Sequence, residues 1–168
     1  MRNAKLYCLF LTFLIFTIAS TVWAADADIT RQTIKGLRAM HVIVEGIQPN
    51  VQRYAQKAGI TKEQIQKDVE AKLKADGFRV LDGDEWLKTP GKPVLYVNIN
   101  THETEKYWYA YNVKVELKQV VLLEANPSIK TLAGTWSIDM TGVANIGTLG
   151  NIRKAVDGLV DNFINACK

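Results

Sequence analysis

The segment Tyr107–Leu123, YWYAYNVKVELKQVVLL, decides the fold because large apolar side chains occupy alternate positions along it. Its odd-numbered positions hold tyrosine, valine or leucine, with Gln119 as the exception, while asparagine, lysine and glutamate fill several even-numbered positions. A period of two is typical of an antiparallel β-strand that buries one face and exposes the other. We therefore expect a long strand whose odd-numbered side chains face a core.

The preceding segment, Val94–Thr101, shows the same alternation and predicts the neighbouring strand of a hairpin. Odd-numbered residues must face odd-numbered ones, because a slip of one residue would expose every apolar side chain. The loop then has an odd number of residues, most simply Glu103–Glu105. This loop pairs Ile99 with Tyr109, and Val97 and Leu95 with the odd residues that follow.

The flanking segments predict the remaining elements. Pro49 suits a first helical turn, Thr61 and Gln64 form a capping box, and Gly77 suits a helix end. We expect a strand over 37–47, helices over 49–58 and 62–76, a short strand over 78–81, the hairpin strands, a turn over Asn126–Ser128, a strand over Leu132–Met140 and a helix over 152–167.

The order β-α-α-β-β-β-β-α indicates an α+β fold: a two-layer sandwich with a mostly antiparallel sheet of about five strands and helices on one face. The last strand carries its apolar set on even positions, namely Trp136, Ile138 and Met140. The last helix has a broad apolar stripe that includes Phe163, so we expect these two faces to meet. A single domain is expected over 37–168, after a flexible lead-in over 25–36.

The N-terminus carries the features of a secretory signal peptide. Arg2 and Lys5 precede the uncharged stretch Leu6–Ala19, and small residues stand at Val22 and Ala24. The stretch is shorter than the 20 or so apolar residues that a membrane-spanning helix needs. We therefore expect residues 1–24 to be a signal peptide, cleaved after Ala24, and the mature protein to be periplasmic or secreted without a stable membrane anchor.

Charge and cysteine content narrow the function further. The formal net charge is +4 and falls to +2 without Arg2 and Lys5, too little to predict a nucleic-acid partner. Cys8 lies in the signal peptide and is preceded by Tyr7, unlike a lipoprotein cysteine. Cys167 then remains alone, so the mature chain forms no intramolecular disulfide.

No motif favours an enzyme class. His41 and His102 have no histidine or cysteine at zinc-ligand spacing. Asp82–Glu85 lacks the twelve-residue calcium pattern and reads as a turn with a helix cap. The glycine-dotted Gly142–Gly150 lacks the ending of a phosphate loop, and Cys167 lies on the apolar helix stripe. We predict no catalytic residue, no metal and no cofactor.

The aromatic run Tyr107–Tyr111 gives the one candidate site. Parity turns its tyrosines toward the helices and Trp108 toward the polar face. With the expected register, Trp108 lies beside Asn100 and close to Asn98, with Tyr96 further along. One interpretation is structural, an exposed tryptophan that covers the sheet. The other is an aromatic anchor for a protein or glycan partner.

Several segments together resemble a family of small exported bacterial proteins of unassigned function. They are Gly36–Arg38, Val42–Glu45, Val69–Leu73, Leu95–Asn100, Tyr109–Val113, Thr135–Ser137 and Val160–Ile164. The resemblance covers nearly all of the mature chain and implies a Gram-negative periplasmic setting with no known reaction.

We therefore predict a non-catalytic binding or accessory protein of the bacterial envelope. The alternative is a small-ligand or glycan binder that uses the outer sheet face around Trp108. A flat aromatic face favours a protein partner, whereas a concave site with polar groups favours a ligand.

Overall fold

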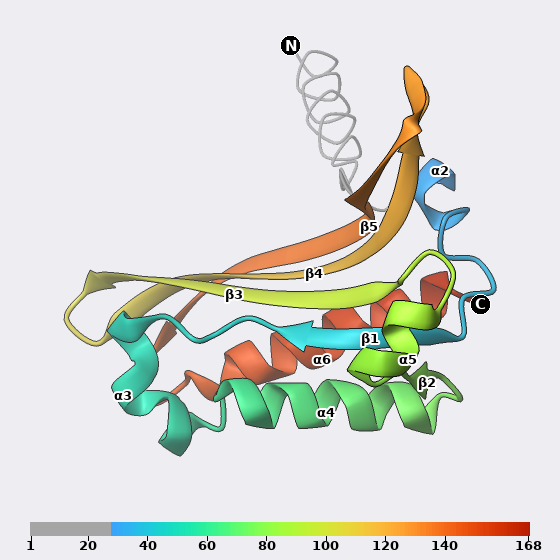
Figure 1. Cartoon of the computed structure of the whole chain (residues 1–168). Coiled ribbons are helices and arrows are strands. Elements are labelled where there is room, and N and C mark those ends of the chain that lie inside the picture. The colour runs from blue at the N-terminus through green and yellow to red at the C-terminus, as the bar shows by residue number, and fades with distance from the viewer. Residues whose placement is uncertain (1–27) are drawn as a thin grey trace, which may run out of the picture.

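Five strands form one mixed sheet in the computed structural model, which describes residues 28–168 (Figure 1). The strands are β1 (Ala39–Val44), β2 (Arg79–Val80), β3 (Val94–Glu105), β4 (Trp108–Leu123) and β5 (Asn126–Asn145), in the order β2-β1-β3-β4-β5. β1 runs parallel to β2 and β3, and the other pairs are antiparallel. The predicted α+β sandwich is confirmed. The predicted signal peptide, its cleavage site and Cys8 lie outside the described residues.

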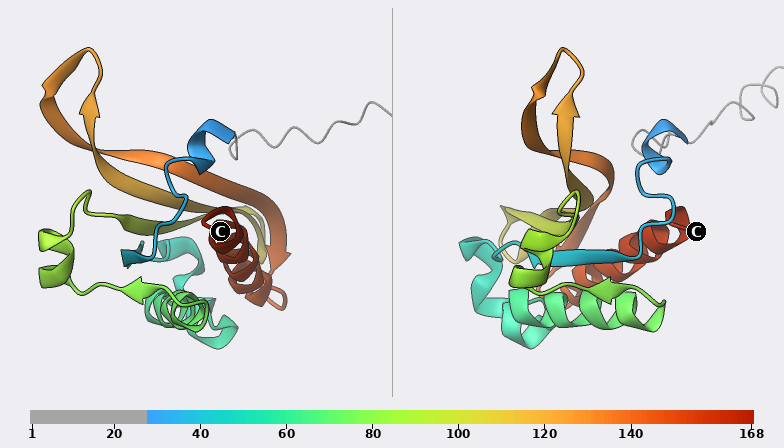
Figure 2. Two further views of the ribbon diagram at one scale, coloured as in Figure 1. Left: turned by 90° about the vertical axis from the view of Figure 1, so that its right-hand side faces the viewer. Right: turned by 45° about the vertical axis from the view of Figure 1, so that its right-hand side comes forward.

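Three helices cover one face of the sheet: α3 (Pro49–Ala58), α4 (Lys62–Ala75) and α6 (Gly150–Ala166), as Figure 2 shows. The short helices α2 (Asp28–Arg31) and α5 (Gly83–Lys88) stand beside β5 and β1. We call the helix-covered face of the sheet the inner face and the opposite face the outer face. No helix among the described residues is long and apolar enough to cross a membrane.

Local sequence signals set the helix ends. Gly59 and Gly77 adopt the left-handed conformation, with φ of 68° and 83°, that glycine tolerates best. Thr61 Oγ1 accepts a hydrogen bond from Gln64 N at 3.2 Å, which is half of the predicted capping box. The Gln64 side chain donates instead to Asp68 Oδ1 at 2.8 Å. The two helices on either side of Gly59 therefore begin and end where their sequence requires.

The core lies between the inner face and the helices. The apolar stripe predicted for the last helix is buried, and it consists of Ile152, Val156, Leu159, Val160, Phe163, Ile164 and, just past the end of α6, Cys167. The Trp136 ring lies 5.3 Å from the Phe163 ring between centroids, so the two predicted faces meet. Residues 28–36 were expected within a flexible lead-in; here they form α2 and a turn, and Ile34 is fully buried in the core.

The hairpin of β3 and β4 has a different register from the predicted one. Ile99 pairs with Val113 rather than Tyr109, a shift of four residues that keeps odd opposite odd. The strands run past the expected loop to a turn at Lys106 and Tyr107, and Tyr107 takes a positive φ of 70°. Tyr107 therefore lies in the turn and is 41% exposed, whereas the sequence had predicted that it faces the helices.

The hairpin of β4 and β5 also extends further than predicted. Its turn is at Glu124 and Ala125, not at Asn126–Ser128, and Pro127 lies within β5, an edge strand where proline is tolerated. The predicted last strand, Leu132–Met140, is the middle of β5. Trp136 and Ile138 are buried as predicted, Trp136 against Phe163 of α6, but Met140, further along the same edge strand, is 44% exposed.

The outer part of this hairpin, residues 118–134, rises from the sheet beyond the helices (Figure 1), and we call it the arm. The strand pairing shifts between Leu117 and Lys118, where Thr135 is left over as a bulge. A bulge bends its strand and increases the local twist. Val121 and Leu123, which were expected to face the core, therefore lie on the arm, and Leu123 is exposed.

Candidate functional site

A chain of polar side chains crosses the outer face over β1 and β3. Tyr96 donates a 2.5 Å hydrogen bond from its hydroxyl to the Glu45 carboxylate, to which Asn98 also donates. Asn100 donates to Asn98, and Gln48 Nε2 donates to Asn100 Oδ1 at 2.9 Å. Three of the four predicted face residues, Tyr96, Asn98 and Asn100, are thus brought together. Their side chains already have hydrogen-bond partners within this chain, with Glu45 accepting from both Tyr96 and Asn98.

The hydrogen bonds of this chain shift two pKa values in opposite directions. The Tyr96 hydroxyl and then Asn98 lower the pKa of Glu45, because both hydrogen bonds stabilise the carboxylate. The same carboxylate, together with burial, raises the pKa of Tyr96. Lys118 Nζ lies 3.9 Å above the centre of the Tyr96 ring. Since both shifts move away from neutrality, this pair is poorly suited to general acid–base chemistry at pH 7.

Trp108 lies apart from these residues. It is 45% exposed on the outer-face side of β4, at its first residue, and pairs with Glu105 and Asn145. Asn100 pairs with Asn112, four residues further along β4, so Trp108 is roughly 13 Å away. The predicted position beside Asn100 is wrong because the hairpin turn is tighter and the register is shifted.

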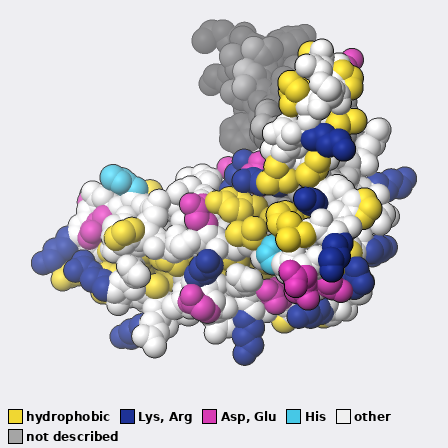
Figure 3. Space-filling view, in the orientation of Figure 1, with side chains coloured by type: hydrophobic (Ala, Val, Ile, Leu, Met, Phe, Trp, Pro, Cys, Tyr) yellow, Lys and Arg dark blue, Asp and Glu magenta, His cyan; other side chains and the backbone are white. Residues whose placement is uncertain are grey.

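The arm is a second surface, and our sequence analysis did not anticipate it. Leu122, Leu123, Ile129 and Leu132 are exposed large hydrophobic residues on it. Yellow side chains are visible along the arm and over its base in Figure 3. A signal was present: the alternation of β4 breaks at Val120–Leu123, where four apolar residues follow one another. Such a run is not typical of a strand with one solvated face.

A hollow of about 450 Å³ lies at the base of the arm. Its wall includes Val120 and Leu132 from the arm and Pro90 from the preceding loop, with Lys92 and Lys130 at the same site. Val120 N donates to Gly91 O at 2.7 Å, which ties the arm to this loop. The hollow therefore combines apolar walls with two positive charges.

A second groove, of about 550 Å³, runs between α4 and α6. Its apolar lining includes Ile65 and Val156. Ion pairs bridge the two helices: Arg153 with Asp68 at 2.5 Å and Lys72 with Asp157 at 2.7 Å. The charged groups are partnered across the groove, so we interpret them as holding the helices together.

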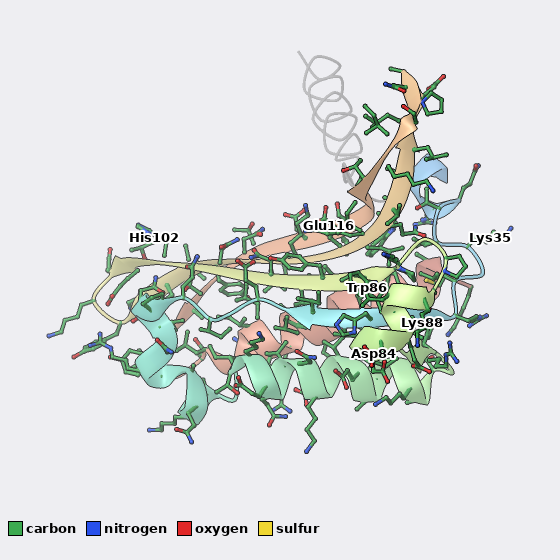
Figure 4. All side chains as sticks on the ribbon, in the orientation of Figure 1. Lys35, Asp84, Trp86, Lys88, His102 and Glu116 are labelled. Atoms are coloured by element: carbon green, nitrogen blue, oxygen red, sulfur yellow. The ribbon has the colours of Figure 1, made fainter. Side chains whose placement is uncertain are left out.

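The histidines and the Asp82–Glu85 turn, which the sequence analysis considered as possible metal sites, are described next. His41 Nδ1 lies 2.8 Å from Leu81 O, and its ring lies against Trp86 of α5. His102 stands on the outer face near the far end of β3 (Figure 4). Asp82 Oδ1 accepts from Glu85 N at 2.8 Å, which confirms the helix cap. Among residues 28–168, no group of three or more His, Cys, Asp and Glu side chains could hold a metal ion.

Cys167 is the one cysteine among residues 28–168, and its thiol is free. It is buried, and burial raises the pKa of its thiol to about 12. A thiol must lose its proton to act as a nucleophile. Cys167 is therefore a core residue rather than a reactive group.

No protein-family model matches the chain, and no curated protein matches it. The resemblance to small exported bacterial proteins stays a prediction.

Proposed function

We propose that this protein is a non-catalytic binding or accessory protein of the bacterial envelope, and that the arm is its main contact with a partner protein. The observation that carries the proposal is the exposure of four large apolar side chains on the arm, which rises beyond α3, α4 and α6 (Figure 1). Exposed apolar patches on soluble proteins commonly mark interaction sites.

The chemistry of the arm suggests what the partner presents. Lys130 of the arm and Lys92 line the hollow at its base, whereas Lys118 lies over the Tyr96 ring and pairs with Glu116 at 3.6 Å. An aliphatic or aromatic side chain flanked by carboxylates would fit the apolar walls and the positive rim. Such a buried anchor within a charged rim is typical of protein interfaces.

Photo-crosslinking in living cells tests this role. A photoreactive amino acid at Leu132 should capture one envelope protein, while the same group at the exposed Lys67 of α4 should not. Leu122→Lys should then reduce the crosslinked yield several-fold, because it places a charge on the apolar surface. Equal yields at Leu132 and Lys67, or no loss with Leu122→Lys, would contradict the proposal.

A glycan-binding role for the outer face is the second candidate. It is favoured by Tyr96, Asn98 and Asn100, which form a row of polar and aromatic groups on one strand. It is disfavoured because these groups already satisfy each other and Trp108 is distant. Calorimetry with cell-wall oligosaccharides would support this role only if binding is lost in Asn98→Ala and kept in Leu122→Lys.

Export is a separate part of the proposal. If residues 1–24 form a signal peptide, protein recovered from its native host should begin at Ala25. Intact-mass measurement decides this directly. A mass that includes residues 1–24, or a lipid on Cys8, would contradict it.

A further inference from the structure

The free edge of β5 is a surface that neither the arm nor the outer face explains. β5 is the last strand of the sheet, and β4 pairs with it on one side only. Thr33 of the segment after α2 donates from its hydroxyl to Thr135 O at 3.1 Å, so that end of the edge is occupied. Within residues 28–168, no other strand pairs with β5 over Ser137–Val143.

The direction of the backbone groups follows from one hydrogen bond. Ile146 N donates to Tyr107 O at 3.1 Å, so even-numbered residues in this stretch direct their N–H and C=O toward β4. Because these groups alternate along an antiparallel strand, the odd-numbered residues direct theirs outward. Ser137, Asp139, Thr141 and Val143 therefore present a row of backbone donors and acceptors at the open edge.

This edge lacks the usual protection against pairing. Soluble proteins cover edge strands, shorten them, or place lysines, prolines and bulges on them. The stretch Ser137–Val143 has one charged residue, Asp139, and no proline. Met140 and Val143 are exposed on opposite faces of it, 44% and 63% respectively. An open strand of this composition favours pairing with another strand.

We propose that a second copy of this chain pairs with the edge, so that two β5 strands run antiparallel about a two-fold axis at Met140 and the two sheets join. Symmetric contacts of this kind are the commonest in soluble oligomers. The surface is separate from the arm, so the proposal does not rest on the proposed function.

The side chains along the edge favour pairing with a second copy of the same strand, and they favour one position of the two-fold axis. A two-fold axis at Asp139 would place that carboxylate against itself, and an axis at Thr141 would place it against Val143. With the axis at Met140, Asp139 faces Thr141 of the second copy, whose hydroxyl can donate to it. Ser137 then faces Val143, so the pairing uses the whole free stretch and stops before Thr135, where the α2 segment is bound.

The inner face supports the same arrangement. Met140 lies on the helix side of the sheet between the buried Ile138 and the half-buried Gly142, yet it is itself 44% exposed. On the two-fold axis it would pack against Met140 of the second copy. Directly opposite residues of an antiparallel pair lie about 4.5–5.5 Å apart between Cα atoms, close enough for two methionines to cover each other.

The first test is the oligomeric state of protein purified after expression of the full chain, measured by sedimentation over a concentration series. The wild type should be a dimer. Met140→Lys should weaken dimerisation more than about tenfold, because two ammonium groups would meet on the axis. Leu122→Lys, the same change on an exposed arm residue, should leave the dimer intact.

The second test fixes the register by disulfide formation in a Cys8→Ser background. Met140→Cys should form an intermolecular disulfide under mild oxidation, since its two copies adjoin. Val143→Cys should not, because its copies would be about 20 Å apart, far beyond disulfide reach. Cys167 is buried and common to both variants.

A wild type that stays monomeric at high micromolar concentration would overturn the proposal. So would equal dimerisation of Met140→Lys and wild type, or stronger crosslinking by Val143→Cys than by Met140→Cys. If the wild type is monomeric and Met140→Lys abolishes capture of an envelope protein, the edge pairs with a strand of that protein instead. Loss of partner capture in Leu122→Lys with the dimer retained would separate the arm's role from that of the edge.

Discussion

The two halves of the hairpin formed by β4 and β5 have similar composition and opposite environments. In the lower half, Tyr109, Val113 and Val115 are buried against the helices, whereas in the arm Leu122 and Leu132 are exposed. Both halves are paired strands rich in β-branched and large apolar residues. The difference is that α6 lies under the lower half alone (Figure 1).

Element lengths explain why the two halves differ. α6 has 17 residues and spans about 26 Å, whereas β4 has 16 residues and spans roughly 53 Å. A single helix cannot cover strands of twice its length. Apolar side chains beyond the helix end must then find another partner or remain in water, and this is the physical basis of our proposal that the arm contacts a partner protein.

The largest contrast should be between Trp136→Ala and Leu132→Ala. Trp136 is fully buried against Phe163, so its truncation should reduce the free energy of unfolding by about 3–5 kcal/mol. Leu132 is half exposed on the arm, and its truncation should cost less than about 1 kcal/mol. Denaturant unfolding measures both. Similar losses for the two variants would show that the arm packs as a core element.

Neighbouring aromatic residues at the lower end of β4 provide the next contrast. Tyr109 is buried, its ring lies edge-on to Tyr54 at 6.5 Å, and its hydroxyl donates to Asn50 O at 3.4 Å. Tyr109→Ala should therefore cost about 3 kcal/mol or more in unfolding free energy. Trp108→Ala should stay within about 1 kcal/mol. A larger loss for Trp108→Ala than for Tyr109→Ala would show that the inner and outer faces of β4 are assigned the wrong way round.

Two glycines of β5 should respond differently to alanine. A Cβ on Gly142 would lie 2.5 Å from the Tyr111 ring, which is packed in the core and cannot move freely. Gly142→Ala should thus cost about 1–3 kcal/mol, as overpacking does. At Gly134, where the arm begins, the Cβ would meet only the flexible end of Glu116. Gly134→Ala should cost less than about 1 kcal/mol, measured by thermal unfolding of both variants.

Patterns in the sequence predicted the elements and the faces, because alternation and helical stripes depend on burial alone. Leu95, Val97 and Ile99 are buried as parity requires. The alternation requires odd-numbered residues to pair with odd-numbered ones, but it does not say which. A register shifted by four residues satisfies this requirement as well as the predicted one does. The positive φ of Tyr107, which allows the tight turn, has no sequence signal as clear as glycine.

The candidate site was predictable to the same degree. Tyr96, Asn98 and Asn100 share a face because they are two residues apart on one strand, and this needs no knowledge of the register. The residue next to Trp108 depends on the register, so the predicted neighbour, Asn100, was wrong. The exposure of the arm and of Met140 depends on how far α6 reaches and on which strand is the edge, neither of which local periodicity encodes.

The smallest effect concerns acid stability and again separates the packed layer from the arm. Arg153 and, less strongly, Gln64 lower the pKa of Asp68 below its usual value of 3.8 through hydrogen bonds to the carboxylate. A carboxylate with a depressed folded pKa stabilises the protein at neutral pH. The contribution disappears as the pH falls through that pKa, because the protonated acid no longer pairs with Arg153.

Both partners are partly exposed, so Asp68→Asn should cost only about 0.2–1 kcal/mol at pH 7. The difference from wild type should shrink in molar salt and vanish near pH 2, as unfolding curves at several pH values would show. Glu124→Gln, at the exposed turn of the arm, is the matched control and should be neutral under all these conditions. An Asp68→Asn cost that persists at pH 2 would mean that the side chain stabilises the α4–α6 contact by its shape rather than by its charge.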